Sequence, residues 1–251
     1  MKLIITVIVF TISFSQDIPT FNGHRAMELL HKQCDLGPRY PGSEGHKEMK
    51  KFFVKFLHPL ADTLFIMDER MSHPYQRRYI ELTNYLARFN EKAPYRIMFM
   101  AHWDTREMAD MDPDPKNHKT PILGANDGAS GVAVLLTLAE ILYALPPLNI
   151  GIDLLFVDGE DMGHSGDADK FGLGTQAFAK QVPEPAPQFA VCLDMVADKE
   201  QRFPIEYFSL QQAPQVVQAI WSLANDLGYT QFENKMGSAV MDDHYYLYKH
   251  A

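Results

Sequence analysis

Cysteine and positive charge are both scarce in this sequence. Only Cys34 and Cys192 occur in its 251 residues, too few for the disulfide framework that stabilises many small secreted domains. The 23 lysines and arginines are outnumbered by 32 aspartates and glutamates, which gives a net charge of −9. Because contact with phosphates requires a basic surface, this balance argues against nucleic acid as the main partner. The hydrophobic content of 46% is ordinary for a globular protein and argues against disorder.

Several common enzyme motifs are also missing. The glycine-rich segment 124–131 has neither the GxGxxG pattern nor the GKS/T pattern of phosphate-binding loops, and its Asp127 would repel phosphate. No Gly-x-Ser-x-Gly elbow occurs, which disfavours a serine hydrolase. Both cysteines have apolar neighbours in the sequence and are more typical of packing residues than of nucleophiles. No repeat or low-complexity linker divides the chain, so we expect a single domain.

The N-terminus has the pattern of a secretory signal peptide. Lys2 is followed by an apolar run over residues 3–12 and then by small residues up to Ser15. The run is shorter than the roughly 20 residues that span a bilayer, so no stable membrane span is expected after cleavage. We predict a signal peptide at residues 1–15, cleavage after Ser15, and a secreted or periplasmic mature chain at residues 16–251. A buried first strand or a retained anchor is the alternative.

Hydrophobic periodicity predicts alternating strands and helices. Helices are expected at residues 22–34, 44–57, 131–145, 175–180 and 214–227, and strands at 63–70, 79–89, 96–101, 150–157, 189–193 and 203–210. The first two strands are expected to be antiparallel neighbours, whereas the near-continuous apolar runs of later strands indicate burial on both faces. The pattern predicts an α/β sandwich with a largely parallel sheet.

Ionisable residues follow several of the predicted strands. His102 and Asp104 follow the strand 96–101, Glu160 and Asp161 follow 150–157, and Asp194 follows 189–193. In open α/β sheets the carboxyl ends of the strands form the ligand site, so these residues should converge with Asp127. So many carboxylates repel one another unless a cation or shared protons offset the charge. Oxygen and imidazole donors without thiolate suit catalytic zinc, with manganese or magnesium as alternatives.

Each of these motifs alone also fits an ordinary turn or a surface ion pair. The ordered set, however, resembles the M28 zinc-peptidase superfamily, and within it the glutaminyl-peptide cyclotransferases of the animal type and their bacterial relatives. The resemblance covers roughly residues 24–251. It is carried by residues 101–106, the loop 112–115, and residues 120–131, 158–161, 193–196 and 242–244.

The resemblance implies a fold and a set of residue roles. The fold would be a three-layer α/β sandwich with a mixed, largely parallel central sheet, helices on both faces, and an incomplete C-terminus. Asp127 and Asp161 resemble zinc ligands, and Glu160 resembles the general acid/base. Asp194 and Asp243 resemble the acidic residues that hydrogen-bond around it. Further candidates are His102, Asp104 and His244, which are implied to support the ligands or to bind a second metal, and Phe171, which is implied to contact substrate.

The implied activity is cyclisation of an N-terminal glutamine in a peptide or protein to pyroglutamate, with release of ammonia. A zinc aminopeptidase of the same superfamily is the first alternative. The resemblance also implies a third zinc ligand, a histidine, beyond the last motif. The sequence stops at Ala251 before it, so we expect a truncated chain that binds Zn²⁺ weakly. A non-catalytic binding protein on the same fold is therefore the second alternative.

Overall fold

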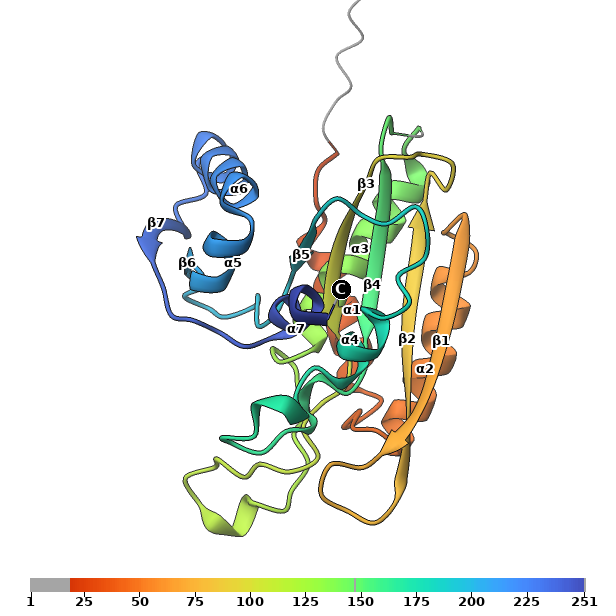
Figure 1. Cartoon of the computed structure of the whole chain (residues 1–251), viewed down its shortest axis with the longest axis vertical. Helices are drawn as coiled ribbons and strands as arrows, with labels where there is room; N and C mark the ends of the chain where they lie inside the picture. The colour runs from red at the N-terminus through yellow and green to blue at the C-terminus, as the bar shows by residue number, and fades with distance from the viewer. Residues whose placement is uncertain (1–18, 147, 251) are drawn as a thin grey trace, which may run out of the picture.

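A five-stranded mixed sheet forms the centre of the computed structural model, which describes residues 19–146 and 148–250 (Figure 1). The predicted signal peptide, residues 1–15, lies outside the described residues. The strand order is β1-β2-β4-β3-β5. The strands are β1 Thr63–Ser72, β2 Tyr79–Phe89, β3 Arg96–His102, β4 Gly151–Val157 and β5 Ala190–Cys192. In the described part of the chain, no helix is long and apolar enough to cross a membrane.

Strand direction confirms the predicted mixed, largely parallel sheet. β1 and β2 form an antiparallel hairpin, and β2 also pairs antiparallel with β4. β3 runs parallel to both β4 and β5. All strands except β2 therefore point the same way, and the carboxyl ends of β3, β4 and β5 meet at one edge. Every residue of the central strand β4 is buried, as expected for a strand covered on both faces.

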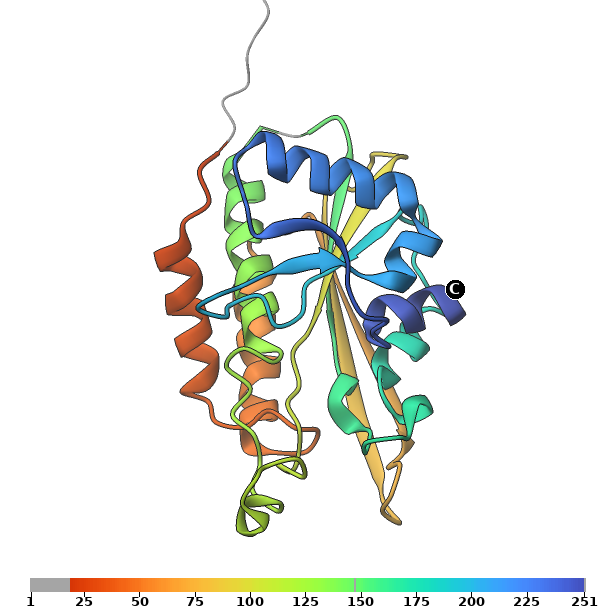
Figure 2. The ribbon, with the colours of Figure 1, turned by 90° about the vertical axis from the view of Figure 1, so that its left-hand side faces the viewer.

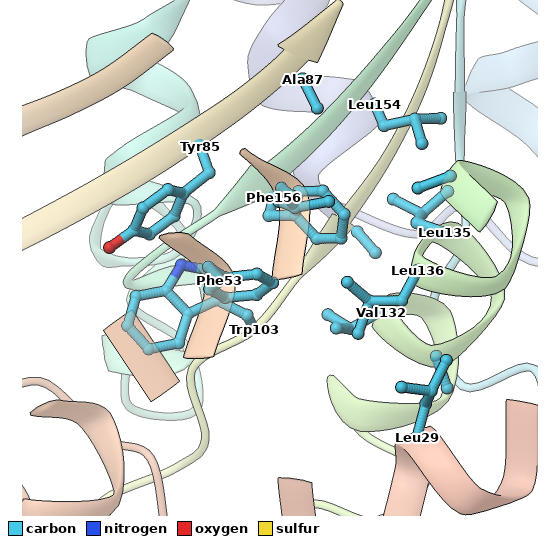
Figure 3. Close-up of a cluster of buried hydrophobic side chains, with 14 of the residues drawn as sticks. Leu29, Phe53, Tyr85, Ala87, Trp103, Val132, Leu135, Leu136, Leu154 and Phe156 are labelled. Carbon is cyan, nitrogen blue, oxygen red and sulfur yellow. The ribbon is translucent and has the colours of Figure 1, made fainter. Parts of the chain in front are cut away.

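Helices cover both faces of the sheet. α1 Gly23–Cys34, α2 Glu44–Leu57 and α3 Ala129–Ala144 pack on one face, where Phe53, Trp103 and Phe156 meet the side chains of α3 (Figure 3). α4 Leu173–Phe178 and α7 Asp243–His250 lie over the other face. Strand β2 shows the alternation directly, because Tyr85 and Ala87 join the first core and Leu86 joins the second.

The last third of the chain differs most from the predictions. β6 Phe203–Ile205 and β7 Phe232–Met236 form a separate two-stranded parallel sheet, beside α5 Tyr207–Gln212 and α6 Pro214–Asp226 (Figure 2). The predicted strand 203–210 is wrong beyond Ile205. The Glu206 carboxylate accepts hydrogen bonds from Phe208 N at 3.0 Å and Ser209 N at 2.6 Å, and this cap begins α5 instead.

The strand predicted at 189–193 is shorter and less buried than expected. β5 comprises only Ala190–Cys192, and all three residues are partly buried. Among the described residues this strand pairs only with β3 and forms an edge of the sheet. It therefore lacks the neighbour on its other side that a fully buried strand would have. Three short 3₁₀ helices, Pro115–Asn117, Glu160–Met162 and Ala168–Lys170, lie in the loops.

Candidate active site

His102 lies at the centre of the converging strand ends and is buried, with 1% exposure. Its Nε2 lies 3.0 Å from Asp127 Oδ1 and 3.3 Å from Asp194 Oδ1. His102 is the last residue of β3, Asp194 follows β5, and Asp127 precedes α3. The structure thus brings together three of the residues that the sequence placed at the carboxyl end of the sheet.

Gly128 allows the chain to pass close to His102 before α3 begins. Its φ of +84° is in the left-handed region that glycine tolerates. A Cβ at this position would lie 2.8 Å from Asp104 O and 3.1 Å from His102 Cε1. The glycine-rich segment is therefore needed for this close approach, and it places Asp127 against the imidazole.

Asp104 positions the turn that follows β4. The side chain is completely buried. Its Oδ1 accepts a hydrogen bond from Glu160 N at 3.0 Å, and its Oδ2 accepts one from Asp161 N at 3.2 Å. Because a carboxylate strengthens the bonds that it accepts, this contact fixes both acidic residues relative to β3.

Asp158 has a different role from the acids that follow it. Its Oδ2 lies 2.9 Å from His46 Nε2 and accepts a hydrogen bond from Thr83 N at 2.7 Å. The His46 ring also stacks on Trp103 with centroids 4.4 Å apart. Asp158 is therefore bound within the protein interior. The sequence reasoning missed His46, because nothing in an amphipathic helix marks one histidine as the partner of a carboxylate 112 residues away.

Asp161 is paired with an arginine for which the sequence suggested no role. Arg106 Nη1 donates to Asp161 Oδ1 at 2.5 Å, and the same guanidinium donates to both oxygens of Asp110 at 2.7 and 2.9 Å. Burial raises the pKa of Asp161 to about 7, the nearby Asp127 adds to this, and Arg106 opposes it.

Glu160 lies among further acidic groups. Burial raises its pKa well above the ordinary value, Asp243 and Asp242 raise it further, and His102 lowers it. Burial, followed by the charge of Asp242, likewise raises the pKa of the Asp243 carboxyl. Thr175 Oγ1 donates to Asp243 Oδ1 at 2.6 Å, whereas the buried Asp243 Oδ2 has no hydrogen-bond partner in the described part of the chain. Burial and neighbouring acids therefore favour the protonated form of both carboxyls.

The two remaining candidates lie at the margin of this cluster. His244 Nε2 is 3.1 Å from Glu206 Oε2, and its Nδ1 is 3.9 Å from Asp242 Oδ2. His244 thus contacts the cap of α5 rather than the His102 group. The Phe171 ring packs on Gly163, where any Cβ would overlap it, and lies 5.7 Å from Arg106 Cζ. Phe171 therefore borders the Arg106–Asp161 pair.

The donor chemistry at His102 fits a metal ion. The ligand atoms of His102, Asp127 and Asp194 lie within 4.8 Å of one another. Burial alone would lower the pKa of His102, but its hydrogen bonds to Asp104, Asp127 and Asp194 raise it well above the ordinary value. Its buried Nδ1 lies 3.5 Å from Asp104 Oδ1. The neighbouring carboxylates thus favour positive charge at this position, and one neutral imidazole with two carboxylates is a donor set that zinc accepts.

Fold and site together define an α/β enzyme domain with an acidic, imidazole-containing centre at the carboxyl edge of its sheet. The sequence model of the family named Peptidase family M28 matches residues 84–251 of the chain. The chain belongs to this family, as the sequence motifs predicted.

Solved structures of two kinds resemble the chain. One is the glutaminyl cyclase of Bacteroides thetaiotaomicron bound to N-acetylhistamine, with a TM-score of 0.89 and 31% identity, covering 93% of this chain and 82% of that chain. Another is a Zn-dependent exopeptidase from Parabacteroides distasonis, with a TM-score of 0.87 and 35% identity, covering 93% of this chain and 82% of that chain. The fold is therefore shared with both cyclases and exopeptidases, and these likenesses confirm the predicted α/β architecture.

Curated relatives are matched over shorter segments. The glutaminyl-peptide cyclotransferase of Drosophila melanogaster is 28% identical over 130 residues, which is 50% of this chain and 34% of that protein. The alkaline phosphatase isozyme conversion protein of Escherichia coli is 37% identical over 82 residues, or 32% of this chain and 24% of that protein. The chain thus spans about a quarter to a third of the curated relatives that it matches.

Proposed function

We propose that this chain is a glutaminyl-peptide cyclotransferase that converts an N-terminal glutamine to pyroglutamate and releases ammonia. The placement of Glu160 carries the proposal. Asp104 fixes its backbone at the carboxyl edge of the sheet, and burial raises the pKa of its carboxyl well above the ordinary value. A raised pKa makes the carboxylate a stronger proton acceptor than an ordinary glutamate. The likeness to a solved glutaminyl cyclase supports this choice of reaction.

Two sets of residues are candidates to hold Zn²⁺. Asp127 and Asp161 are the pair that the motifs suggest, and His102, Asp127 and Asp194 are one of two compact groups of possible donors among the described residues. Asp127 belongs to both sets. When bound, zinc would supply a Lewis acid that polarises the γ-amide carbonyl of the substrate glutamine.

The residues of the chain provide the proton transfers. The acidic cluster attracts the substrate α-amino group, and Glu160 takes a proton from that nitrogen as it attacks the γ-carbonyl carbon. The new C–N bond closes a five-membered ring, the original C–N bond of the amide breaks, and Glu160 passes the proton to the departing nitrogen as ammonia forms. Asp194 and Asp243 would hold the polar groups around Glu160 in position. Because the attack is intramolecular, orientation supplies much of the acceleration.

A zinc aminopeptidase is the second candidate, favoured by the likeness to the Zn-dependent exopeptidase. In that reaction Glu160 would take a proton from water, which attacks the first peptide bond. The same residues thus serve both candidates, and only the substrates distinguish them.

The test compares a Gln-peptide with a Leu-anilide, each incubated with the chain in the presence of zinc or of a chelator. Ammonia release that the chelator abolishes is expected. Anilide cleavage without ammonia release would instead identify a peptidase, and neither activity would indicate a binding protein. Glu160→Gln should lower ammonia release by at least about 10²-fold. The matched variant Glu81→Gln, at an exposed position on β2, should leave it unchanged.

A further inference from the structure

A cavity of about 200 Å³ lies beside the candidate active site. Its walls come from the turn between β1 and β2, from residues 106–108 after β3, and from residues 161–164 after β4. Arg106 and Asp161, which form an ion pair at the active site, also line this cavity. The candidate active site and the cavity therefore share a wall. No step of the proposed reaction takes place in the cavity.

Tyr75 and His164 form one rigid side of the cavity. Their rings stack with centroids 3.7 Å apart and planes inclined by 7°. The Tyr75 hydroxyl donates to Asp167 Oδ2 at 3.0 Å and accepts from His164 N at 2.7 Å. These bonds tie the hairpin turn to the loop that carries Asp161, so the cavity is formed before any ligand enters.

The polar groups that line the cavity are largely occupied by protein contacts. His73 Nδ1 accepts from Tyr75 N at 3.1 Å and from Gln76 N at 3.2 Å, and its Nε2 lies 3.4 Å from Glu107 Oε2. The Arg106 guanidinium is bound by Asp110 and Asp161. Thioether and ring surfaces make up much of the rest of the lining, with Met108 and Met162 among them. This lining suits an apolar side chain, and methionine sulfur also contacts aromatic rings favourably.

We propose that this cavity binds the side chain of the second residue of the peptide substrate and favours an apolar one. The inference rests on the proposed function, in which the acidic cluster binds the α-amino group of the first residue. The second residue then lies next to the wall formed by Arg106 and Asp161. The cavity of about 200 Å³ is large enough for a leucine or phenylalanine side chain.

Isothermal titration calorimetry tests whether the cavity binds the second side chain. It measures the affinity of the chain for Gln-Leu-Gly and for Gln-Gly-Gly, with zinc present. Wild-type chain should bind Gln-Leu-Gly at least about tenfold more tightly, because the leucine side chain is buried. Tyr75→Ala should reduce this preference to less than about threefold and leave the affinity for Gln-Gly-Gly within about twofold. Met108→Trp fills the cavity without removing the Tyr75 contacts, and it should reduce the preference in the same way. This second variant keeps the test valid if Tyr75→Ala does not fold. Tyr95→Ala, at a distant exposed tyrosine, should leave the preference unchanged.

Ammonia release, measured separately, distinguishes this inference from the proposed function. A binding preference for Gln-Leu-Gly without ammonia release would refute the cyclase and support the cavity assignment. Ammonia release without a side-chain preference would support the cyclase and overturn the cavity assignment. Equal binding, no binding of either peptide, or a preference that survives both cavity variants would also overturn it.

Discussion

Asp104→Asn is the sharpest test of how the active site is assembled. The substitution keeps the size of the buried side chain but replaces one of the two oxygens that accept from Glu160 N and Asp161 N. One backbone N–H would then face an amide NH₂ group instead of an acceptor. A hydrogen bond to a charged group contributes about 1.5–3 kcal/mol, and an unsatisfied buried donor costs a similar amount. We expect the free energy of unfolding to fall by about 2–3 kcal/mol, which leaves most of the 5–15 kcal/mol that is typical of folded proteins.

The same substitution should impair catalysis more than binding. If the turn after β4 loses one of its two anchors, the Glu160 carboxyl moves relative to the substrate, and a displacement of about 1 Å can lower the rate about 10²-fold. The expected result is a fall in kcat for ammonia release of about that size with little change in KM. Urea denaturation and the ammonia assay measure the two effects on the same protein.

Asp62→Asn is the matched control. Asp62 Oδ2 also accepts a backbone hydrogen bond, from Glu91 N at 3.2 Å, but at an exposed site. Its substitution should change the free energy of unfolding by less than about 0.5 kcal/mol. If Asp104→Asn behaves like this control in both measurements, Asp104 does not position the turn, and the reasoning is wrong.

Three other substitutions probe the acidic cluster and its surroundings. The pKa of Asp161 is about 7 in the folded chain against 3.8 for an ordinary aspartate, so the folded state binds more protons between these values. The free energy of unfolding of the metal-free chain should therefore fall as the pH rises from about 4 to about 7, and Asp161→Asn should reduce this slope in urea titrations. Asp127→Asn should abolish the rise in Tm that zinc causes; an undiminished rise would exclude both proposed donor sets. Asp153→Ala would leave two buried guanidinium groups without their carboxylate and should lower the free energy of unfolding by about 3–5 kcal/mol in urea denaturation.

The elements predicted best are those whose packing is encoded locally. α2 spans residues 44–57 and β2 spans residues 79–89, both as predicted. A helix with one apolar face and a serine cap, or a long strand between turns, has little dependence on distant contacts. β7 was not predicted because its segment, Phe232–Met236, is short and mostly exposed. It forms only where β6 provides backbone partners from about 30 residues earlier in the chain.

The location of the candidate site could be predicted, because parallel strands place their carboxyl ends at the same edge of the sheet. The pairing of charges within it could not. Arg106 neutralises Asp161 across 55 residues of sequence, and His102 contacts Asp127 and Asp194. No spacing rule specifies such distant pairs. Glu160 has no comparable ion pair among the described residues, and burial together with neighbouring acids favours its protonated form. A carboxyl with a raised pKa is a stronger base once it has lost its proton, which suits Glu160 to take a proton from the amine and to pass it to the departing nitrogen.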